Sequence, residues 1–245
     1  MDLITISSFD GITNFREPLL KNLFPEDGAT NNRPFQYNKE KHVIFISCRV
    51  HPGETPASFL MNSIIKFLTN PYDPRAEILR KVFVFKIIPI INVDGVSRGY
   101  YRYDTNSLNM NRHYINPNIK TQPEIYAIKR IFLFYSEKNK IKYYFDLHAH
   151  ASSKGLFLFG NNLDFLPQIE NCLLPKIMEV NCEDLNFNNC IFSERCMRTK
   201  ERGDKFSKEG AGRVYFHKTC EVIHCYTVEA SYFRGIYKGK IPQNY

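Results

Sequence analysis

Short apolar runs that alternate with segments of helical periodicity constrain the fold of this chain more than any other feature. The runs are rich in Val, Ile and Phe, as buried strands are, and they lie at residues 42–50, 82–91, 142–147, 156–159 and 222–229. Apolar side chains recur three and four positions apart, as in amphipathic helices, over residues 57–68, 123–135 and 165–180. This order predicts an α/β fold with a mixed, largely parallel central sheet and helices on both faces.

The stretch from residue 181 to residue 214 is polar and irregular, and it contains the sequence Glu201-Arg-Gly-Asp204. Long loops of this kind in α/β proteins are usually functional or mobile. We find no linker that would divide the chain, and therefore expect a single domain.

Composition excludes several classes of protein. With 43% apolar and 14% aromatic residues, the 245-residue chain can bury a sizeable core, so we expect neither disorder nor a repeat array. The longest apolar stretch, residues 82–91, is too short to span a bilayer, and the N-terminus does not read as a secretory signal. The seven cysteines form no C-x-x-C pair, which is typical of free thiols in a reducing compartment. We expect a cytoplasmic protein, with the nucleus left open, that binds neither membranes nor nucleic acid.

His51 and Glu54 follow the first apolar run, three positions apart. Residues at this spacing across a tight turn face the same side and can share one metal ion, although a surface His and a helix N-terminal Glu are the alternative. His148 follows the run at 142–147, and so brings an imidazole to another strand end, where open α/β sheets place their sites. A catalytic zinc typically has three protein ligands and one open coordination position, and two His and one Glu match this number.

Two further groups of residues suit hydrolysis. Glu229 ends the last apolar run. A carboxylate in this position is either a salt-bridged residue at the end of a strand or a general base for the attacking water. Arg102, Asn111 and Arg112 crowd one short loop. A guanidinium beside an amide suits capture of a carboxylate, although plain surface charge is the alternative.

Five motifs lie in order along the chain: HPGETPASF at 51–59, N-x-D-G-V at 92–96, N-x-N-R at 109–112, DLHAH at 146–150 and Y-T-x-E-A at 226–230. Together they resemble the zinc carboxypeptidases, and the flanking sequence resembles the type-five members of their cytosolic branch. Enzymes of that branch remove glutamates from polyglutamylated proteins such as tubulin. The resemblance implies a zinc-dependent metallocarboxypeptidase that hydrolyses C-terminal or branch-point glutamates from such tails, in the cytoplasm or on microtubules.

The resemblance implies a role for each residue of the reaction centre. His51, Glu54 and His148 would bind one Zn²⁺. Glu229 would be the catalytic base. Arg102 would polarise the scissile carbonyl and stabilise the oxyanion.

The substrate-binding residues follow from the same resemblance. Asn111 and Arg112 would hold the terminal carboxylate of the substrate. Arg213 would line the pocket for the glutamate side chain, with a solvated loop charge as the alternative. Secreted members of the family carry Asp at the position of Asn109, where it accepts a hydrogen bond from a zinc-binding His, so the neutral amide here predicts a less basic ligand.

The resemblance also bears on domain organisation. The family carries a β-rich domain before the catalytic domain and further helix after the base. This chain starts near the first catalytic strand and stops sixteen residues after Glu229. We therefore expect residues 1–245 to be a metallocarboxypeptidase catalytic domain that is truncated at both ends.

Two other functions stay open from the sequence. A zinc N-acyl amidohydrolase acting on a small acidic substrate uses a similar triad and base. Alternatively, the chain could be an inactive truncated module that binds acidic tails by charge, which the net charge of +8 favours. A lysine-rich solvated surface gives the same net charge, so charge alone does not identify a partner.

Overall fold

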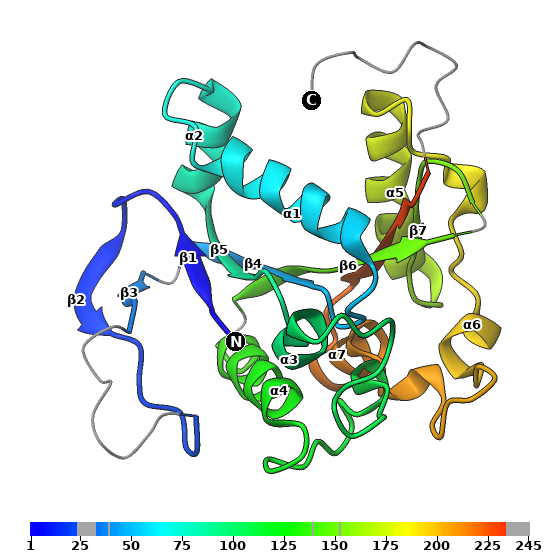
Figure 1. The fold of residues 1–245 in the computed structure, drawn as a ribbon. Helices are drawn as coiled ribbons and strands as arrows, with labels where there is room; N and C mark the ends of the chain where they lie inside the picture. Colours follow the sequence, from blue (N-terminus) through cyan, green and yellow to red (C-terminus); the bar gives the residue numbers. More distant parts are fainter. Residues whose placement is uncertain (24–32, 39, 139, 152, 234–245) are drawn as a thin grey trace.

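The computed structural model describes residues 1–23, 33–38, 40–138, 140–151 and 153–233 (Figure 1). These residues form a six-stranded sheet in the order β1-β5-β4-β6-β8-β7. Its strands are β1 (Ile4–Ile6), β4 (His42–Cys48), β5 (Phe83–Ile88), β6 (Ile141–His150), β7 (Leu156–Phe159) and β8 (His224–Ser231). The four inner strands run parallel, and β1 and β7 pair antiparallel at the edges. The predicted mixed, largely parallel sheet is confirmed.

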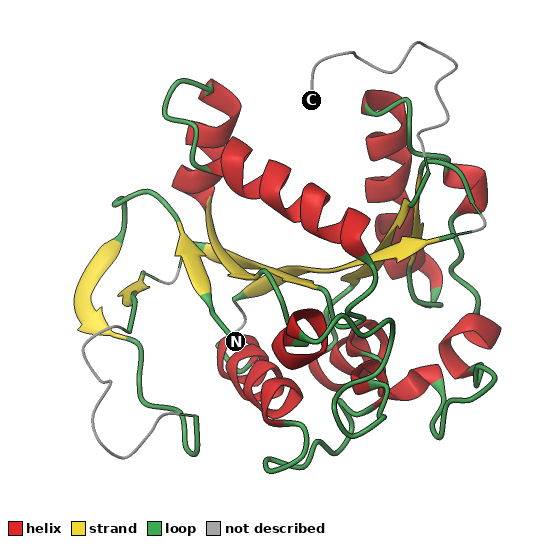
Figure 2. Cartoon of the chain, in the orientation of Figure 1, coloured by secondary structure: helices red, strands yellow, loops and turns green. Residues whose placement is uncertain are grey.

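Helices lie on both sides of the sheet, as predicted (Figure 2). One side carries α1 (Thr55–Leu68), α2 (Pro74–Val82) and α5 (Phe165–Asn181). The other side carries α3 (Val93–Ser97), α4 (Pro123–Ser136) and α7 (Gly212–Cys220). The remaining elements are a separate strand pair, a short helix and three single turns: β2 (Ile12–Arg16), β3 (Phe35–Tyr37), α6 (Glu194–Arg198), η2 (Met110–Arg112), η3 (Phe187–Asn189) and η4 (Lys208–Gly210).

The alternation of side chains along β4 shows why its sequence is apolar at almost every position. Ile44 and Ile46 join the hydrophobic cluster on the α1 side, and Phe45 between them joins the cluster on the α4 side. Each inner strand is therefore covered on both faces. On the α4 side, Phe132 stacks on Phe216 of α7 with ring centroids 3.7 Å apart, which ties two helices to the sheet.

The segments predicted from periodicity are present, with some shifted ends and additional elements. The strand predicted at 82–91 is shorter than expected: its first residue, Val82, ends α2, and β5 occupies only Phe83–Ile88. Helix α2 was not predicted, although its start carries two helix signals: Pro74 in the first turn and Asp73, whose side chain accepts a hydrogen bond from the backbone of Arg75. Helix α7 was also missed, and it begins inside the stretch expected to be irregular.

Of the four inner strands, β4, β6 and β8 are consecutive and parallel, so their carboxyl ends lie at the same edge of the sheet. His148 of β6 pairs in register with Glu229 of β8, and Cys48 at the end of β4 pairs with Leu147. His51 lies three residues beyond the end of β4. Strand pairing therefore places His148 beside Glu229 and brings the turn that follows β4, which carries His51 and Glu54, to the same edge of the sheet. None of the helices among the described residues combines the length and apolarity needed to cross a bilayer.

The aromatic packing between α4 and α7 leads to a test of the core. Phe132 is fully buried and contacts Phe45, Tyr144 and Phe216. We expect Phe132→Ala to lower the free energy of unfolding by about 3–5 kcal/mol, because it leaves a cavity. Phe59 on α1 is 73% exposed, so Phe59→Ala should cost less than about 0.5 kcal/mol. Urea denaturation of both variants measures the difference, and equal losses would contradict the described core.

Candidate metal centre and active site

A tight turn between β4 and α1 carries two of the predicted ligands. Arg49 adopts a left-handed conformation with φ of 57°, and its guanidinium donates two hydrogen bonds to the carbonyl of Pro52, at 3.0 and 2.6 Å. A side chain at Gly53 would collide with Tyr101, whose ring carbon lies 2.7 Å from the position of a Cβ. The turn directs His51 and Glu54 toward the same point, as their spacing predicts.

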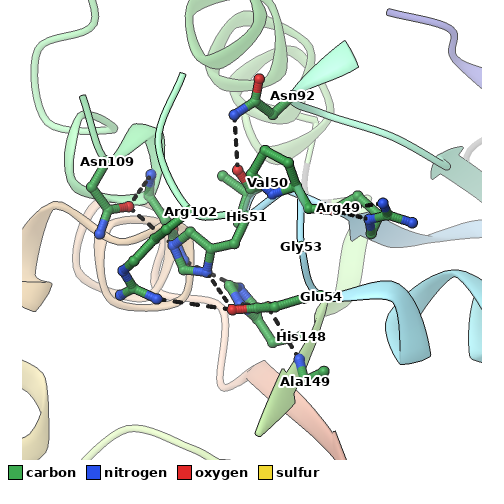
Figure 3. A network of polar contacts seen from close by, with 12 residues as sticks. Arg49, Val50, His51, Gly53, Glu54, Asn92, Arg102, Asn109, His148 and Ala149 are labelled. Atoms are coloured by element: carbon green, nitrogen blue, oxygen red, sulfur yellow. Dashed lines mark hydrogen bonds and ion pairs between the residues drawn. The ribbon is translucent and has the colours of Figure 1, made fainter. Parts of the chain in front are cut away.

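His51, Glu54 and His148 meet in one buried cluster (Figure 3). The Nδ1 atom of His51 lies 2.7 Å from Oε1 of Glu54, and Nδ1 of His148 lies 2.9 Å from Oε2 of the same carboxylate. The backbone N–H of Ala149 donates to Oε2 at 3.1 Å and fixes the carboxylate. One ligand atom from each of the three residues lies within 4.8 Å of the others, so all three could bind one metal ion.

The electrostatics of the cluster suit a cation. Burial lowers the pKa of His51. Burial alone would raise the pKa of Glu54, but the two imidazoles outweigh it and hold that pKa below its ordinary value. Burial acts to lower the pKa of His148, but Asp146 and Glu54 outweigh it and raise that pKa well above its ordinary value. Binding of a cation would compete with protonation of His148. Two imidazoles and a carboxylate are the donors that catalytic zinc sites use, so the residues fit zinc.

Each imidazole has a second partner on its far nitrogen. His51 Nε2 lies 3.0 Å from Oδ1 of Asn109, which is the contact expected from the sequence. His148 Nε2 lies 2.9 Å from Oδ2 of Asp146, whose Oδ1 accepts a hydrogen bond from Ser47 at 2.8 Å. Such partners orient the ring and leave the other nitrogen free to bind a metal.

Glu229 faces the cluster from the neighbouring strand. It is buried, and burial raises the pKa of its carboxyl to about 7, with the Glu54 carboxylate adding to the rise. A carboxyl group with a pKa near neutrality can take and return a proton at the operating pH, as a general base must.

All eight residues predicted for the site line one pocket of about 240 Å³: His51, Glu54, Arg102, Asn111, Arg112, His148, Arg213 and Glu229. They come from six separate segments of the chain. The fold thus assembles the predicted set in one place, while the role of each residue stays a prediction.

Glu201, which also lines this pocket, connects two of the three predicted arginines, Arg102 and Arg112. Its Oε2 accepts a hydrogen bond from Arg102 at 2.7 Å and another from Arg112 at 3.1 Å. Its Oε1 pairs with Lys208 at 2.8 Å. Arg102 also lies 3.9 Å from the Glu54 carboxylate, so it is next to the metal ligands.

Asn111 and Arg213 are buried rather than displayed at the surface. The Asn111 amide lies 3.2 Å from Nε2 of His148, and its Oδ1 accepts a hydrogen bond from the backbone of Gly212 at 3.1 Å. Arg213 belongs to α7, not to a loop, and donates to Oδ1 of Asn161 at 2.7 Å and to the carbonyl of Gly160. The alternative of a solvated loop charge at Arg213 is therefore wrong.

Sequence reasoning missed four polar residues of this site: Asp146, Glu201, Asp204 and Lys208. Asp146 could have been found, because it stands two positions before His148 on a strand and so shares its face. Glu201 and Asp204 lie in a polar loop that carried no signal beyond its length and composition.

Comparison with known proteins decides the family. Residues 26–172, more than half of the chain, match the zinc carboxypeptidases. The chain belongs to this family. The matched range contains His51, Glu54 and His148, and zinc is accordingly the cofactor. Membership in a peptidase family favours a metallocarboxypeptidase over the small-molecule amidohydrolase.

Curated relatives confirm the resemblance to the cytosolic branch. Cytosolic carboxypeptidase-like protein 5 of Bos taurus is 34% identical over 99% of this chain and 37% of its own length. The Homo sapiens protein of the same name is 33% identical over the same shares. Cytosolic carboxypeptidase 6 of Mus musculus is 32% identical over 86% of this chain and 38% of its own length. The chain thus spans less than half the length of these relatives.

Solved structures share the fold. A metallo-carboxypeptidase from Burkholderia cenocepacia is similar over 94% of this chain and 51% of its own, with a TM-score of 0.67 and 20% identity. Carboxypeptidase A from Helicoverpa armigera is similar over 81% of this chain and 54% of its own, with a TM-score of 0.60 and 15% identity. The family's α/β fold is therefore present.

The raised pKa of Glu229 predicts a pH-dependent effect on stability. Between pH 4.5, its ordinary pKa, and about pH 7, the folded protein holds a proton that the unfolded chain has lost, so unfolding becomes easier as the pH rises. We expect Glu229→Gln to stabilise the chelator-treated protein by about 3 kcal/mol at pH 8 and by less than about 1 kcal/mol at pH 5.

Urea denaturation at the two pH values measures this difference. The matched control is Glu77→Gln on α2, where Lys81 lowers the pKa of the exposed carboxyl, so any pH effect has the opposite sign. A stabilisation by Glu229→Gln that does not grow with pH would show that its carboxyl is not protonated at neutrality.

Proposed function

We propose that residues 1–245 form the catalytic domain of a zinc carboxypeptidase that removes C-terminal or branch-point glutamates from polyglutamylated protein tails. Tubulin tails are the proposed substrate, and the cytoplasm, including microtubules, is the proposed location. The names of the cytosolic relatives support the location. The pocket supports the reaction and the acidic substrate.

The observation that carries this proposal is one pocket that joins hydrolytic residues to two buried cations. Arg112 comes from η2 and Arg213 from α7, and both line the pocket with Glu229. Arg213 donates to neutral acceptors, the carbonyl of Gly160 and the amide oxygen of Asn161; among the described residues no carboxylate forms an ion pair with it, and burial lowers its pKa. A buried cation is stabilised when an anion reaches it. A C-terminal glutamate offers two carboxylates, one for each arginine.

The residues of the chain divide the chemistry between them. When bound, zinc would polarise the scissile carbonyl and lower the pKa of a water molecule. Glu229 would take a proton from the attacking water and pass it to the leaving nitrogen. Arg102, 3.9 Å from a metal ligand, would donate to the carbonyl oxygen as negative charge develops on it. Arg112 would fix the terminal carboxylate and thereby the distance to the scissile bond.

Release of free glutamate from a polyglutamylated peptide tests the reaction. We expect the zinc-loaded protein to release glutamate and a chelator to stop the release. Glu229→Gln should lower kcat by at least 100-fold while zinc binding is kept, because only the proton transfer is lost. No release by the zinc-loaded protein, or release unchanged in Glu229→Gln, would contradict the proposal. A protein that only binds acidic tails by charge would be indifferent to this substitution.

Arginine variants test the choice of substrate. We expect Arg213→Ala to lower kcat/KM roughly 100-fold for a Glu-terminated peptide and much less for a Leu-terminated one, because only the first leaves an anion unpaired. Arg112→Ala should weaken both peptides alike, since every peptide has a terminal carboxylate. The exposed Arg198, paired with Glu194 on α6, provides the control Arg198→Ala. Equal losses for both peptides in Arg213→Ala would show that another residue selects glutamate.

A further inference from the structure

Asp204 is a buried carboxylate between the metal site and the proposed substrate site. Its side chain is 1% exposed. It accepts hydrogen bonds from Nδ2 of Asn109, at 2.9 and 3.1 Å, and it pairs with Nε of Arg112 at 2.8 Å. The turn that carries it is closed by a hydrogen bond from its own N–H to the carbonyl of Glu201, and Gly203 within the turn has a φ of +91° that favours glycine.

The chemistry of Asp204 dictates how Asn109 is oriented. An ionised carboxylate only accepts hydrogen bonds, so Asn109 must present its NH₂ group to Asp204. Its carbonyl oxygen then faces Nε2 of His51 at 3.0 Å. An oxygen acceptor there requires the proton of the imidazole to be on Nε2, which leaves the lone pair of Nδ1 directed at Glu54 and the metal position.

We propose that Asp204 is a positioning residue for both halves of the active site. Through Asn109 it sets the tautomer of the metal ligand His51, and through its ion pair it fixes the guanidinium of Arg112. The negative charge of Asp204 acts on the metal ligand His51 indirectly, through the neutral amide of Asn109. The part concerning His51 depends only on the metal site, whereas the part concerning Arg112 rests on the proposed function.

A competing account gives Asp204 a simpler role. The backbone N–H of Asn111 donates to Oδ1 of Asn109 at 3.2 Å, and this bond also favours the observed orientation of the amide. If it sufficed, Asp204 would only neutralise Arg112, and zinc affinity would not depend on it. The two accounts therefore differ in whether the affinity for zinc, measured without substrate, depends on Asp204.

The test measures zinc affinity by competition with a chelator for the 245-residue chain and its variants. We expect Asp204→Asn and Asp204→Ala to weaken zinc binding at least tenfold, as loss of partners behind a metal ligand does. Glu201→Ala is the matched control, because Glu201 pairs with Arg112 but makes no described contact with Asn109, and it should leave zinc affinity unchanged. Unchanged zinc affinity in both Asp204 variants would overturn the proposal.

A charge exchange keeps the test decisive if Asp204→Ala does not fold. Asn109→Asp combined with Asp204→Asn puts a carboxylate directly beside His51 and an amide behind it. His51 can still donate to position 109, and the hydrogen bond between positions 109 and 204 can form with its donor reversed. We expect this double variant to bind zinc as the unaltered chain does, whereas Asp204→Asn alone does not. Zinc binding as weak as in the single variant would contradict the assignment.

The same variants test the part concerning Arg112. Asp204→Asn, alone or in the double variant, removes the buried carboxylate from Arg112 and leaves only the more exposed Glu201. The KM for a Glu-terminated peptide should therefore be raised in both, although zinc affinity is restored in the double variant. A KM restored together with zinc affinity would show that Asp204 does not act on Arg112. If no variant, including the unaltered chain, cleaves peptides, the proposed function fails, while the zinc measurements still decide the role of Asp204 at His51.

Discussion

The parallel pairing of β4, β6 and β8 is the constraint on which the active site depends. Each strand delivers its functional group at the same edge of the sheet, and His148 and Glu229 are direct neighbours in the β6–β8 register. Successive side chains on a strand point to opposite faces, so a slip of one residue would turn His148 away from Glu54. The apolar residues that cover both faces hold this register, which makes the hydrophobic core a condition for the site's geometry.

The pocket gathers charged groups that the fold alone does not require. Burial raises the pKa of Glu229 and lowers that of Arg213, because removal from water disfavours the charged form of each group. Glu54 differs, since its two imidazole neighbours more than offset the cost of its burial. Glu54 is thus stabilised within the metal site, whereas burial dominates at the proposed base and the proposed specificity residue, which a partner from outside the chain would stabilise.

The sequence made part of this site predictable for a physical reason. The metal ligands and Glu229 stand at or just beyond the ends of strongly apolar runs, and strand pairing fixes what lies at such ends. Asp204 was not predictable, because it reaches Asn109 and Arg112 from a loop without periodicity, over 90 residues away along the chain. Helix α7 was missed because its nine residues include Gly, Arg, His and Lys and present a weak apolar face.

The loop of residues 201–204 carries two carboxylates whose exposures differ. Arg112 meets both of them, Asp204 through Nε and Glu201 through a terminal nitrogen. The Glu201 side chain is 37% exposed and can return to water at small cost, whereas the buried Asp204 cannot. The contact of Arg112 with Asp204 is therefore fixed, whereas its contact with Glu201 can be exchanged for another. A carboxylate that replaced Glu201 at Arg112 would meet a guanidinium that is already oriented, and the charge around Arg112 would stay the same.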